Sequence, residues 1–508
     1  MSGIAPVSDD PVIAFSSSLG PSGQLPRPGR AYRRRMSAVA GWFRWRTTPD
    51  RLRGMAAVTV IVAVLLGVIT AVSFTSIASG LRLIGQQSEP EVLATTDLYF
   101  RLNDMDAQVA NVLLVGGQRG LGIDRQQAQA IYEQDREQAD QDLQRAAVVA
   151  GSLPSAQQLV RTLLDGLGRY EALAGEAMYL DGQGPGQPGR PPSAALVLYR
   201  QATDLLRSGI LPAAQALTDQ NTAALDRAYQ AKRSTALYGT LWVALAGVAL
   251  LAALVSLQFY LMLRFRRILN PALIGATVVI LALVAASATG LAAQAGHLRV
   301  AKAEAFDSII ALSQARAVSD DANADESRYL VDPARAGQYQ QAFESRSQQL
   351  VQLQGAGIFQ YDAALARALS AYRANHADVR FGGYLGVEFR NITFAGERTA
   401  AEKALAAYQV YERDDRHIRA LNRGGNLRGA IAFDTSYAPG NSNWAFTQYD
   451  NALVALIAIN QRAFTGAIRA AQQDTNGWTE LIPGAAVAGI SILVLIGVRP
   501  RLAEYRYG

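Results

Sequence analysis

Four long apolar segments without a single charged side chain constrain the fold of this 508-residue chain more than any other feature. A helix needs roughly 20 apolar residues to cross the hydrocarbon core of a bilayer, and each segment is long enough to do so. The sequence therefore predicts four membrane-spanning helices, at residues 55–80, 238–263, 272–293 and 481–498. Everything else in the chain lies before, between or after these spans.

The second and third spans form a hairpin, because only the short link 264–271 separates them. This link contains Arg264, Arg266 and Arg267 and no acidic residue. Loops rich in lysine and arginine stay in the cytoplasm, so we expect the link, the N-terminus and the C-terminus on that side. The two long segments 81–237 and 294–480 are then extracytoplasmic.

The charge distribution agrees with this topology. Residues 1–54, the link and the tail 499–508 together carry a net charge of +11, whereas residues 82–237 and 294–480 carry −4 and −1. The basic composition therefore indicates membrane topology, and no nucleic-acid partner is expected. Residues 1–50, rich in Pro, Gly, Ser and Arg, are predicted to be a disordered cytoplasmic leader.

Both extracytoplasmic segments have the apolar periodicity of helical bundles. In the first, Leu159, Leu163, Tyr170 and Ala177 recur at helical spacing, and clusters of Gly and Pro separate four helical stretches. The stretches predicted here are 81–115, 124–150, 155–181 and 193–237, followed in the second segment by 294–331, 335–377, 395–420 and 444–480. The predicted fold is all-α, with four transmembrane helices and two tandem extracytoplasmic four-helix bundles.

An internal repeat explains this arrangement. A shift of 216 residues places Met55 on Pro271, Asp104 on Asp320 and Val115 on Val331 without a gap. The second and fourth spans are offset by about 242 residues, which places a net insertion inside the second bundle. We interpret the chain as a duplicated helix, bundle, helix unit whose copies meet at the hairpin.

The sequence contains no recognisable catalytic motif. His297, His376 and His417 lie far apart, cysteine is absent, and no nucleophile or phosphate-loop motif is present. We therefore predict a protein that is not an enzyme, with no catalytic residue, metal or cofactor.

Candidate binding residues fall in two outer groups. The turns farthest from the membrane are exposed positions at which a partner protein could dock. The predicted outer contact residues are Gln118, Arg119, Arg190, Asp332, Pro333 and Trp444. Arg413, Arg416 and Arg419 share one helix at a spacing of three and could instead hold a carboxylate ligand, although a mutually paired, solvated face is the simpler interpretation.

The cytoplasmic link and tail form a third candidate surface. Its predicted contact residues are Arg264, Arg266, Arg267, Arg499, Arg501 and Tyr505. The same arginines could serve only to fix topology at the lipid headgroups, and the sequence does not separate these two roles.

The unit of span, outer bundle and span resembles the sensory half of bacterial chemoreceptors. More specifically, the motifs NSNWAF at 441–446, INQ at 459–461 and RPRLAEYR at 499–506 resemble the actinobacterial GlnX-type membrane proteins. The resemblance covers residues 50–508. It implies a relay in which the solute-binding lipoprotein GlnH reports aspartate or glutamate to the bundles, and the serine/threonine kinase PknG receives the signal inside.

We therefore expect a multi-pass transmembrane signal transducer in the cell membrane, in contact with lipids and these two protein partners. A homodimer is a further possibility, because Gly484 and Ala488 have the spacing of a helix-packing motif. The alternatives are a sensor that binds a small ligand directly in a bundle and a scaffold protein of the cell envelope.

Overall fold

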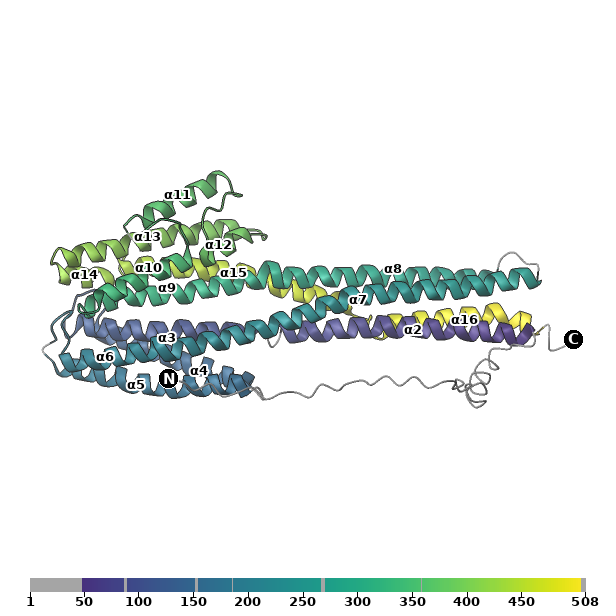
Figure 1. Ribbon diagram of the computed structural model, residues 1–508, viewed down its shortest axis with the longest axis horizontal. Helices are drawn as coiled ribbons and strands as arrows, with labels where there is room; N and C mark the ends of the chain where they lie inside the picture. Colours follow the sequence, from purple (N-terminus) through teal and green to yellow (C-terminus); the bar gives the residue numbers. More distant parts are fainter. Residues whose placement is uncertain are drawn as a thin grey trace, which may run out of the picture.

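The computed structural model describes residues 48–85, 89–150, 154–184, 186–265, 270–357 and 359–503. Within these ranges the chain is helical and contains no strand, apart from one isolated bridge between Gln352 and Gly382. The all-α prediction is confirmed. The molecule is elongated, with a broad head at one end and a narrow helical bundle at the other (Figure 1).

Four helices form the narrow end, which we call the span bundle. They are α2 (Thr48–Leu83), α7 (Leu211–Phe265), α8 (Pro271–Arg299) and α16 (Leu481–Ala503). Each is long and apolar enough to cross a membrane, which confirms the four predicted spans and fits a multi-pass membrane protein. Leu66, Leu250, Ile280 and Ile490 pack inside.

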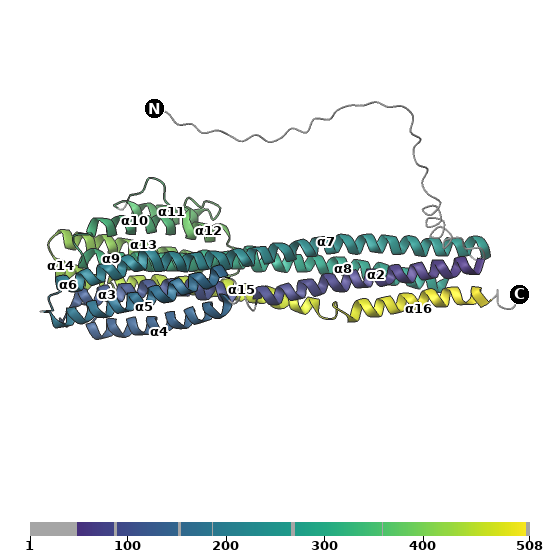
Figure 2. The same cartoon turned by 60° about the horizontal axis from the view of Figure 1, so that its bottom comes forward.

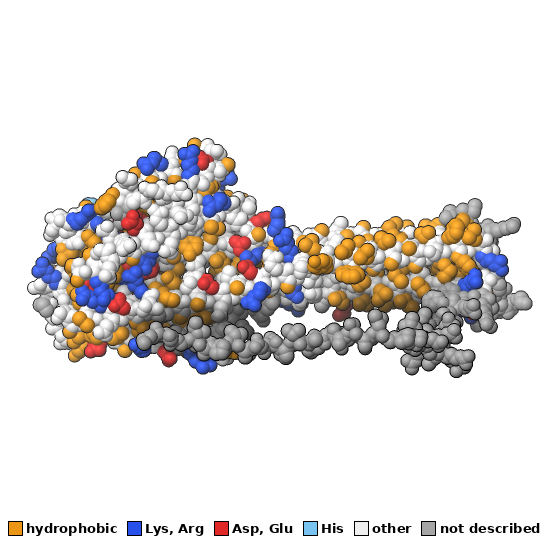
Figure 3. Space-filling view, in the orientation of Figure 1, with side chains coloured by type: hydrophobic (Ala, Val, Ile, Leu, Met, Phe, Trp, Pro, Cys, Tyr) orange, Lys and Arg blue, Asp and Glu red, His pale blue; other side chains and the backbone are white. Residues whose placement is uncertain are grey.

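The outer surface of the span bundle is apolar. Ile61, Val248, Val278 and Ile492 are more than half exposed there, and hydrophobic side chains cover this section of the molecule (Figure 3). Such a surface suits lipid better than water. Hydroxyl groups inside the span helices are satisfied locally, as where Thr70 donates to the carbonyl oxygen of Leu66.

The first bundle is close to its predicted form. It consists of α3 (Glu89–Val115), α4 (Arg125–Ala150), α5 (Pro154–Gln183) and α6 (Ser193–Leu205), and α6 runs through the π-helical turn η2 (Leu206–Ile210) into α7. Within the predicted stretch 81–115, α2 ends at Leu83 and α3 begins at Glu89, and residues 86–88 lie outside the described residues.

The second bundle contains more helices than predicted. Helix α8 continues through η3 (Val300–Phe306) into α9 (Asp307–Val331). The others are α10 (Ala336–Leu350), α11 (Tyr361–Ala374), α12 (Gly383–Arg390), α13 (Glu397–Arg423), α14 (Leu427–Asp434) and α15 (Ser442–Thr475). The predicted helix 335–377 is therefore two helices. The segments 378–394 and 422–443, which lie between predicted helices and were expected to be loops, contain the short helices α12 and α14.

Glycine explains part of this difference. Gly355 and Gly383 have φ angles of +73° and +74°, which residues with a side chain rarely adopt. A Cβ at Gly383 would lie 2.5 Å from the carbonyl oxygen of Gln349. The backbone therefore crosses closely here, and α12 folds back over the end of α10.

The two bundles form one head. A single hydrophobic cluster includes Leu113 and Tyr199 of the first bundle together with Leu330, Tyr339 and Ile431 of the second. Figure 2 shows the helices of both bundles lying side by side along their length. The two tandem bundles therefore pack against each other and share a core.

Candidate functional site

Helices α3 and α9 pack along each other at the centre of the head, and equivalent positions of the repeat touch there. The Arg316 guanidinium carbon lies 3.9 Å from the centre of the Phe100 ring, and the Ser327 hydroxyl donates to Asn111 at 3.0 Å. Both pairs are separated by the 216 residues of the repeat. In a two-fold interface, equivalent residues meet at the axis, so the halves pack as a pseudo-dimer around α3 and α9.

Arg328 is the central residue of this contact. Its side chain is fully buried, yet it carries a charge. Its Nε donates to Asp106 of the first bundle at 2.9 Å, and its Nη1 donates to Asp321 and Asp325 of its own helix at 2.9 Å each. A charge buried in this way is tolerated because three carboxylates, those of Asp106, Asp321 and Asp325, lie within ion-pair distance of it.

Hydrogen bonds from side chains of the first bundle also fix the position of Asp106. It accepts hydrogen bonds from the Tyr170 hydroxyl at 3.1 Å, the Tyr199 hydroxyl at 3.2 Å and the Thr203 hydroxyl at 3.0 Å. These donors lie on α5 and α6, while Asp106 lies on α3. One carboxylate therefore joins three helices of the first bundle to α9 of the second.

Two further arginines complete what we call the Arg328 network. Arg346 on α10 donates from Nε to Asp321 at 2.5 Å and also contacts Asp325. Arg207, on η2, lies 3.7 Å from Asp325. Three arginines thus face Asp106, Asp321 and Asp325, and the formal charges cancel.

A cavity of about 230 Å³ opens beside this network. Tyr99 and Arg207 of the first bundle line it, together with Asp321, Arg346 and Gln349 of the second. It lies at the boundary between the halves. Because both arginines of its lining already contact aspartates, the cavity offers no uncommitted cation to a ligand.

Further contacts join the halves toward the tip of the head. Arg200 on α6 donates from Nε to Asp332 at 2.7 Å, and Arg335 donates to Asp204 at 2.8 Å. The Thr435 hydroxyl donates to the carbonyl oxygen of Leu121 at 3.0 Å.

A buried carboxyl group in the second bundle gives a pH prediction. Burial raises the pKa of Glu412 from 4.5 to about 8, and the Tyr408 hydroxyl donates to it. The native state therefore binds more protons than the unfolded state between these values, so this group's contribution to stability falls as pH rises through about 8. We expect Glu412→Gln to reduce the drop in melting temperature between pH 5.5 and 8.5, whereas the exposed Glu176→Gln should leave it unchanged. An equal drop in Glu412→Gln and the parent protein would contradict the assignment.

The predicted outer contact residues differ in their exposure. Gln118, Arg119, Arg190 and Pro333 are exposed at the tip of the head. Asp332 was expected there but is wholly buried by its ion pair with Arg200, so its prediction as an exposed contact is wrong. Trp444 is half-buried at the start of α15.

The structure does not bring the three arginines of α13 together as one ligand-binding face. Arg419 is buried, pairs with Asp415 at 2.9 and 2.6 Å, and lies 4.5 Å from the Tyr329 ring centre. Arg416 pairs with Asp362, and Arg413 is exposed. Arg416 and Arg419 are therefore paired with carboxylates, as the simpler interpretation expected. Arg419, however, is buried and not solvated.

Three of the predicted cytoplasmic contact residues, Arg264, Arg499 and Arg501, are described and lie at the end of the span bundle opposite the head. Arg264 and Arg499 are exposed and Arg501 is half-buried. Arg266, Arg267 and Tyr505 lie outside the described residues. The Asn270 side chain donates to the carbonyl oxygen of Gly497 at 2.8 Å, which ties the start of α8 to the end of α16.

Sequence reasoning missed the Arg328 network. Asp321, Asp325 and Arg328 follow one another at spacings of four and three, a pattern typical of ion pairs on an exposed helix face. The signal that could have indicated the network is the high density of charged residues in this helix, which other helices surround on nearly every side. Within the described residues, no group of three or more His, Cys, Asp or Glu side chains could hold a metal ion.

Comparison with known proteins identifies one related domain. Residues 80–230, which include the whole first bundle, match the family model described as the actinobacterial sensor domain. No curated protein and no solved structure gives a significant match. The family match supports a sensor with a role in signal transduction.

Proposed function

We propose that the chain is a non-enzymatic transmembrane signal transducer that relays extracellular aspartate or glutamate status from a solute-binding lipoprotein to a cytoplasmic serine/threonine kinase. The sensor-domain match supports the sensory part of this proposal. The resemblance to GlnX-type proteins suggests the partners. The basic link and tail favour an orientation with the head outside the cell.

The observation that carries the proposal is helical continuity between the Arg328 network and the span bundle. Helix α8 runs through η3 into α9, so residues 271–331 hold both a span and Arg328. Likewise, residues 193–265 hold Tyr199, Thr203 and a span in one uninterrupted run of α6, η2 and α7. A helix transmits a displacement along its length, so a change in packing around Arg328 would move the ends of both spans.

The exposed tip is the docking surface in this proposal. Gln118, Arg119 and Arg190 expose polar and charged groups on the first half of the head, and Pro333 is exposed on the second half. A protein docked across them would change the relative position of the two bundles. The Arg328 network, which lies between the bundles, would then be biased toward one of two arrangements.

The cytoplasmic link and tail are the output surface. The hydrogen bond between Asn270 of the link and Gly497, two residues before the tail, supports a surface that both segments share and that the kinase would contact. We expect replacement of Arg264, Arg266, Arg267, Arg499 and Arg501 by glutamine to abolish the kinase response to external aspartate. Phosphorylation of a kinase substrate in cells measures this response.

The control for this variant is Arg51→Gln/Arg53→Gln, which removes arginine charge from the same end of the span bundle. Topology is checked by the accessibility of single introduced cysteines, since the chain has none of its own. A full response in the five-arginine variant, with unchanged topology, would rule out the output surface.

A second candidate function is direct binding of a small ligand in the head. The cavity beside Arg346 favours it, because residues of both bundles line that cavity. Its arginines, however, are already neutralised by Asp321 and Asp325. This alternative predicts a response to aspartate alone, which the relay does not.

A further inference from the structure

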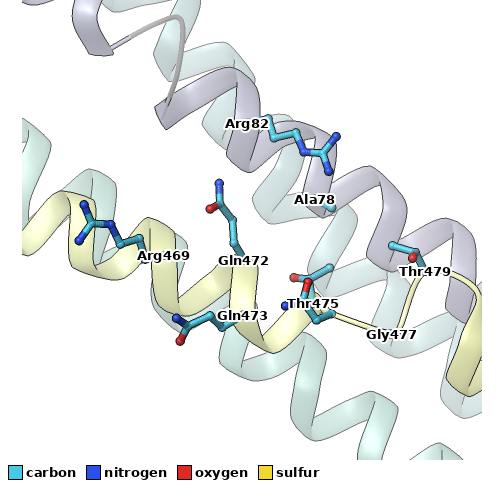
Figure 4. Close-up of a pocket in the computed structure, with 9 residues that line it drawn as sticks. Ala78, Arg82, Arg469, Gln472, Gln473, Thr475, Gly477 and Thr479 are labelled. Atoms are coloured by element: carbon cyan, nitrogen blue, oxygen red, sulfur yellow. The ribbon is translucent and has the colours of Figure 1, made fainter.

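A polar cavity of about 420 Å³ lies at the neck, where the head meets the span bundle. It is formed by the end of α2, the last turns of α15 and the turn that leads into α16. Figure 4 shows Gln472 reaching from α15 toward α2, with Arg82 and Arg469 on either side of it. The other lining residues are Ala78, Gln473, Thr475, Asn476, Gly477 and Thr479.

The position of this neck cavity is at the membrane surface. Arg82 follows the apolar stretch of α2 directly, and Thr479 lies two residues before the start of α16. Trp478, the residue before Thr479, stacks on Phe74, and the two ring centres are 4.8 Å apart. Tryptophan at the end of a span is typical of the lipid headgroup region, so the cavity opens at headgroup level.

The neck cavity is equipped for an anion. Among the described residues, neither Arg82 nor Arg469 makes an ion pair, and no acidic side chain lines the cavity. The nearby Asp474 is engaged with His297 at 3.0 Å instead. Gln472, Gln473 and Asn476 add amide N–H donors. Arginine with neighbouring N–H groups matches the geometry of a phosphate.

The surface next to the cavity is suited to acyl chains. Leu481, which begins α16, is 74% exposed, and Val72 on α2 is 62% exposed. A free anion would use only the polar part of this surface. A phospholipid would use both parts, with its phosphate in the cavity and its chains along α2 and α16.

We propose that the neck cavity binds the headgroup of an anionic phospholipid from the leaflet on the side of the head. Arg82 on α2 and Arg469 on α15 lie on either side of Gln472 and supply the positive charge that attracts the headgroup. The bound lipid thereby contacts both the end of α2 and the last turns of α15. This binding does not depend on the proposed kinase relay.

Native mass spectrometry of the full chain in a nonionic detergent tests the proposal, with dioctanoyl phosphatidylglycerol as the probe. We expect one tightly retained lipid on the parent protein and at least about tenfold weaker retention on Arg82→Gln/Arg469→Gln, because the positive charge of both arginines that line the cavity is lost. The matched control is Arg227→Gln/Arg233→Gln, which removes the same charge from α7 above its span. It should retain the lipid as the parent does. Melting temperatures near that of the parent show that each variant is folded.

Four results would overturn the proposal. Equal retention of dioctanoyl phosphatidylcholine would show that the site does not select an anionic headgroup. Displacement of the lipid by inorganic phosphate at similar concentration would identify a free-anion site. Unchanged retention in Arg82→Gln/Arg469→Gln, or an equal loss in the control pair, would show that this cavity is not where the lipid binds.

Discussion

Arg328→Met should destabilise the head by about 3–5 kcal/mol, the usual cost of breaking a buried ion pair by removing one partner. The substitution leaves Asp106, Asp321 and Asp325 buried with less positive charge to balance them. Thermal and chemical unfolding of the purified protein in nanodiscs measure the effect. Arg413→Met is the matched control, because it removes the same charge from an exposed position on α13, and it should change stability by less than about 1 kcal/mol.

A double-mutant cycle shows whether the cost arises at the contact between the bundles. Asp106→Asn removes the carboxylate that Arg328 reaches across the boundary. If the two side chains act as a pair, Asp106→Asn/Arg328→Met will be less unstable than the sum of the single variants. Strict additivity would mean that Arg328 stabilises only its own helix.

The second large effect is expected at the tip of the head, for Gly122→Ala. Gly122 has a φ angle of +73°, and a Cβ there would lie 2.3 Å from the Thr435 hydroxyl and 2.9 Å from the backbone nitrogen of Ser436. Backbone strain accounts for roughly 1–2 kcal/mol, and the clash adds a further ~1–3 kcal/mol. Since Thr435 belongs to the second bundle, the substitution should also push the two bundles apart.

Gly120→Ala isolates the part due to the clash. Gly120 has a φ angle of +78°, yet a Cβ there would meet nothing within 4 Å. Gly120→Ala therefore introduces backbone strain without a steric clash. The melting temperature should fall more for Gly122→Ala than for Gly120→Ala, and an equal fall would show that the tips of the two bundles do not touch at this point.

The span bundle could be predicted from sequence because it depends on a local property. Eighteen or more uncharged residues in a row have few other folds available, and all four such segments are helices long and apolar enough to cross a membrane. The repeat was also visible in the sequence. It aligned the first outer helices of the two halves, but an alignment alone does not say that Phe100 touches Arg316 or that Asn111 touches Ser327.

The candidate site was hidden because its partners are distant in sequence. Asp106 and Arg328 are separated by 222 residues, and Arg200 and Asp332 by 132. The sequence pattern of Asp332, a polar residue beside Pro333, is that of an exposed turn. Only the packing of one bundle against the other buries it, and that packing follows from the whole shape of each bundle.

The short helices in the second bundle show the same limit. Helical periodicity alone predicted one helix over 335–377, whereas the close backbone crossing at Gly383 depends on how α12 folds back over α10. Asn426, which caps α14 by accepting from the Gly429 amide, was part of a predicted loop. The capping role of Asn426 can be recognised from the local sequence. The apolar surface against which Ala430 and Ile431 pack cannot.

The most direct test of the relay measures movement at the cytoplasmic end. Leu263 on α7 and Ala503 on α16 are both exposed, and the chain lacks cysteine, so Leu263→Cys/Ala503→Cys carries spin labels only at these two sites. Double electron-electron resonance in nanodiscs then reports the distance between them. The relay predicts a shifted distance distribution when the solute-binding lipoprotein and aspartate are added together, and no shift with aspartate alone. A shift with aspartate alone would favour direct binding in the head, and an unchanged distribution in every condition would contradict signal transmission through these helices.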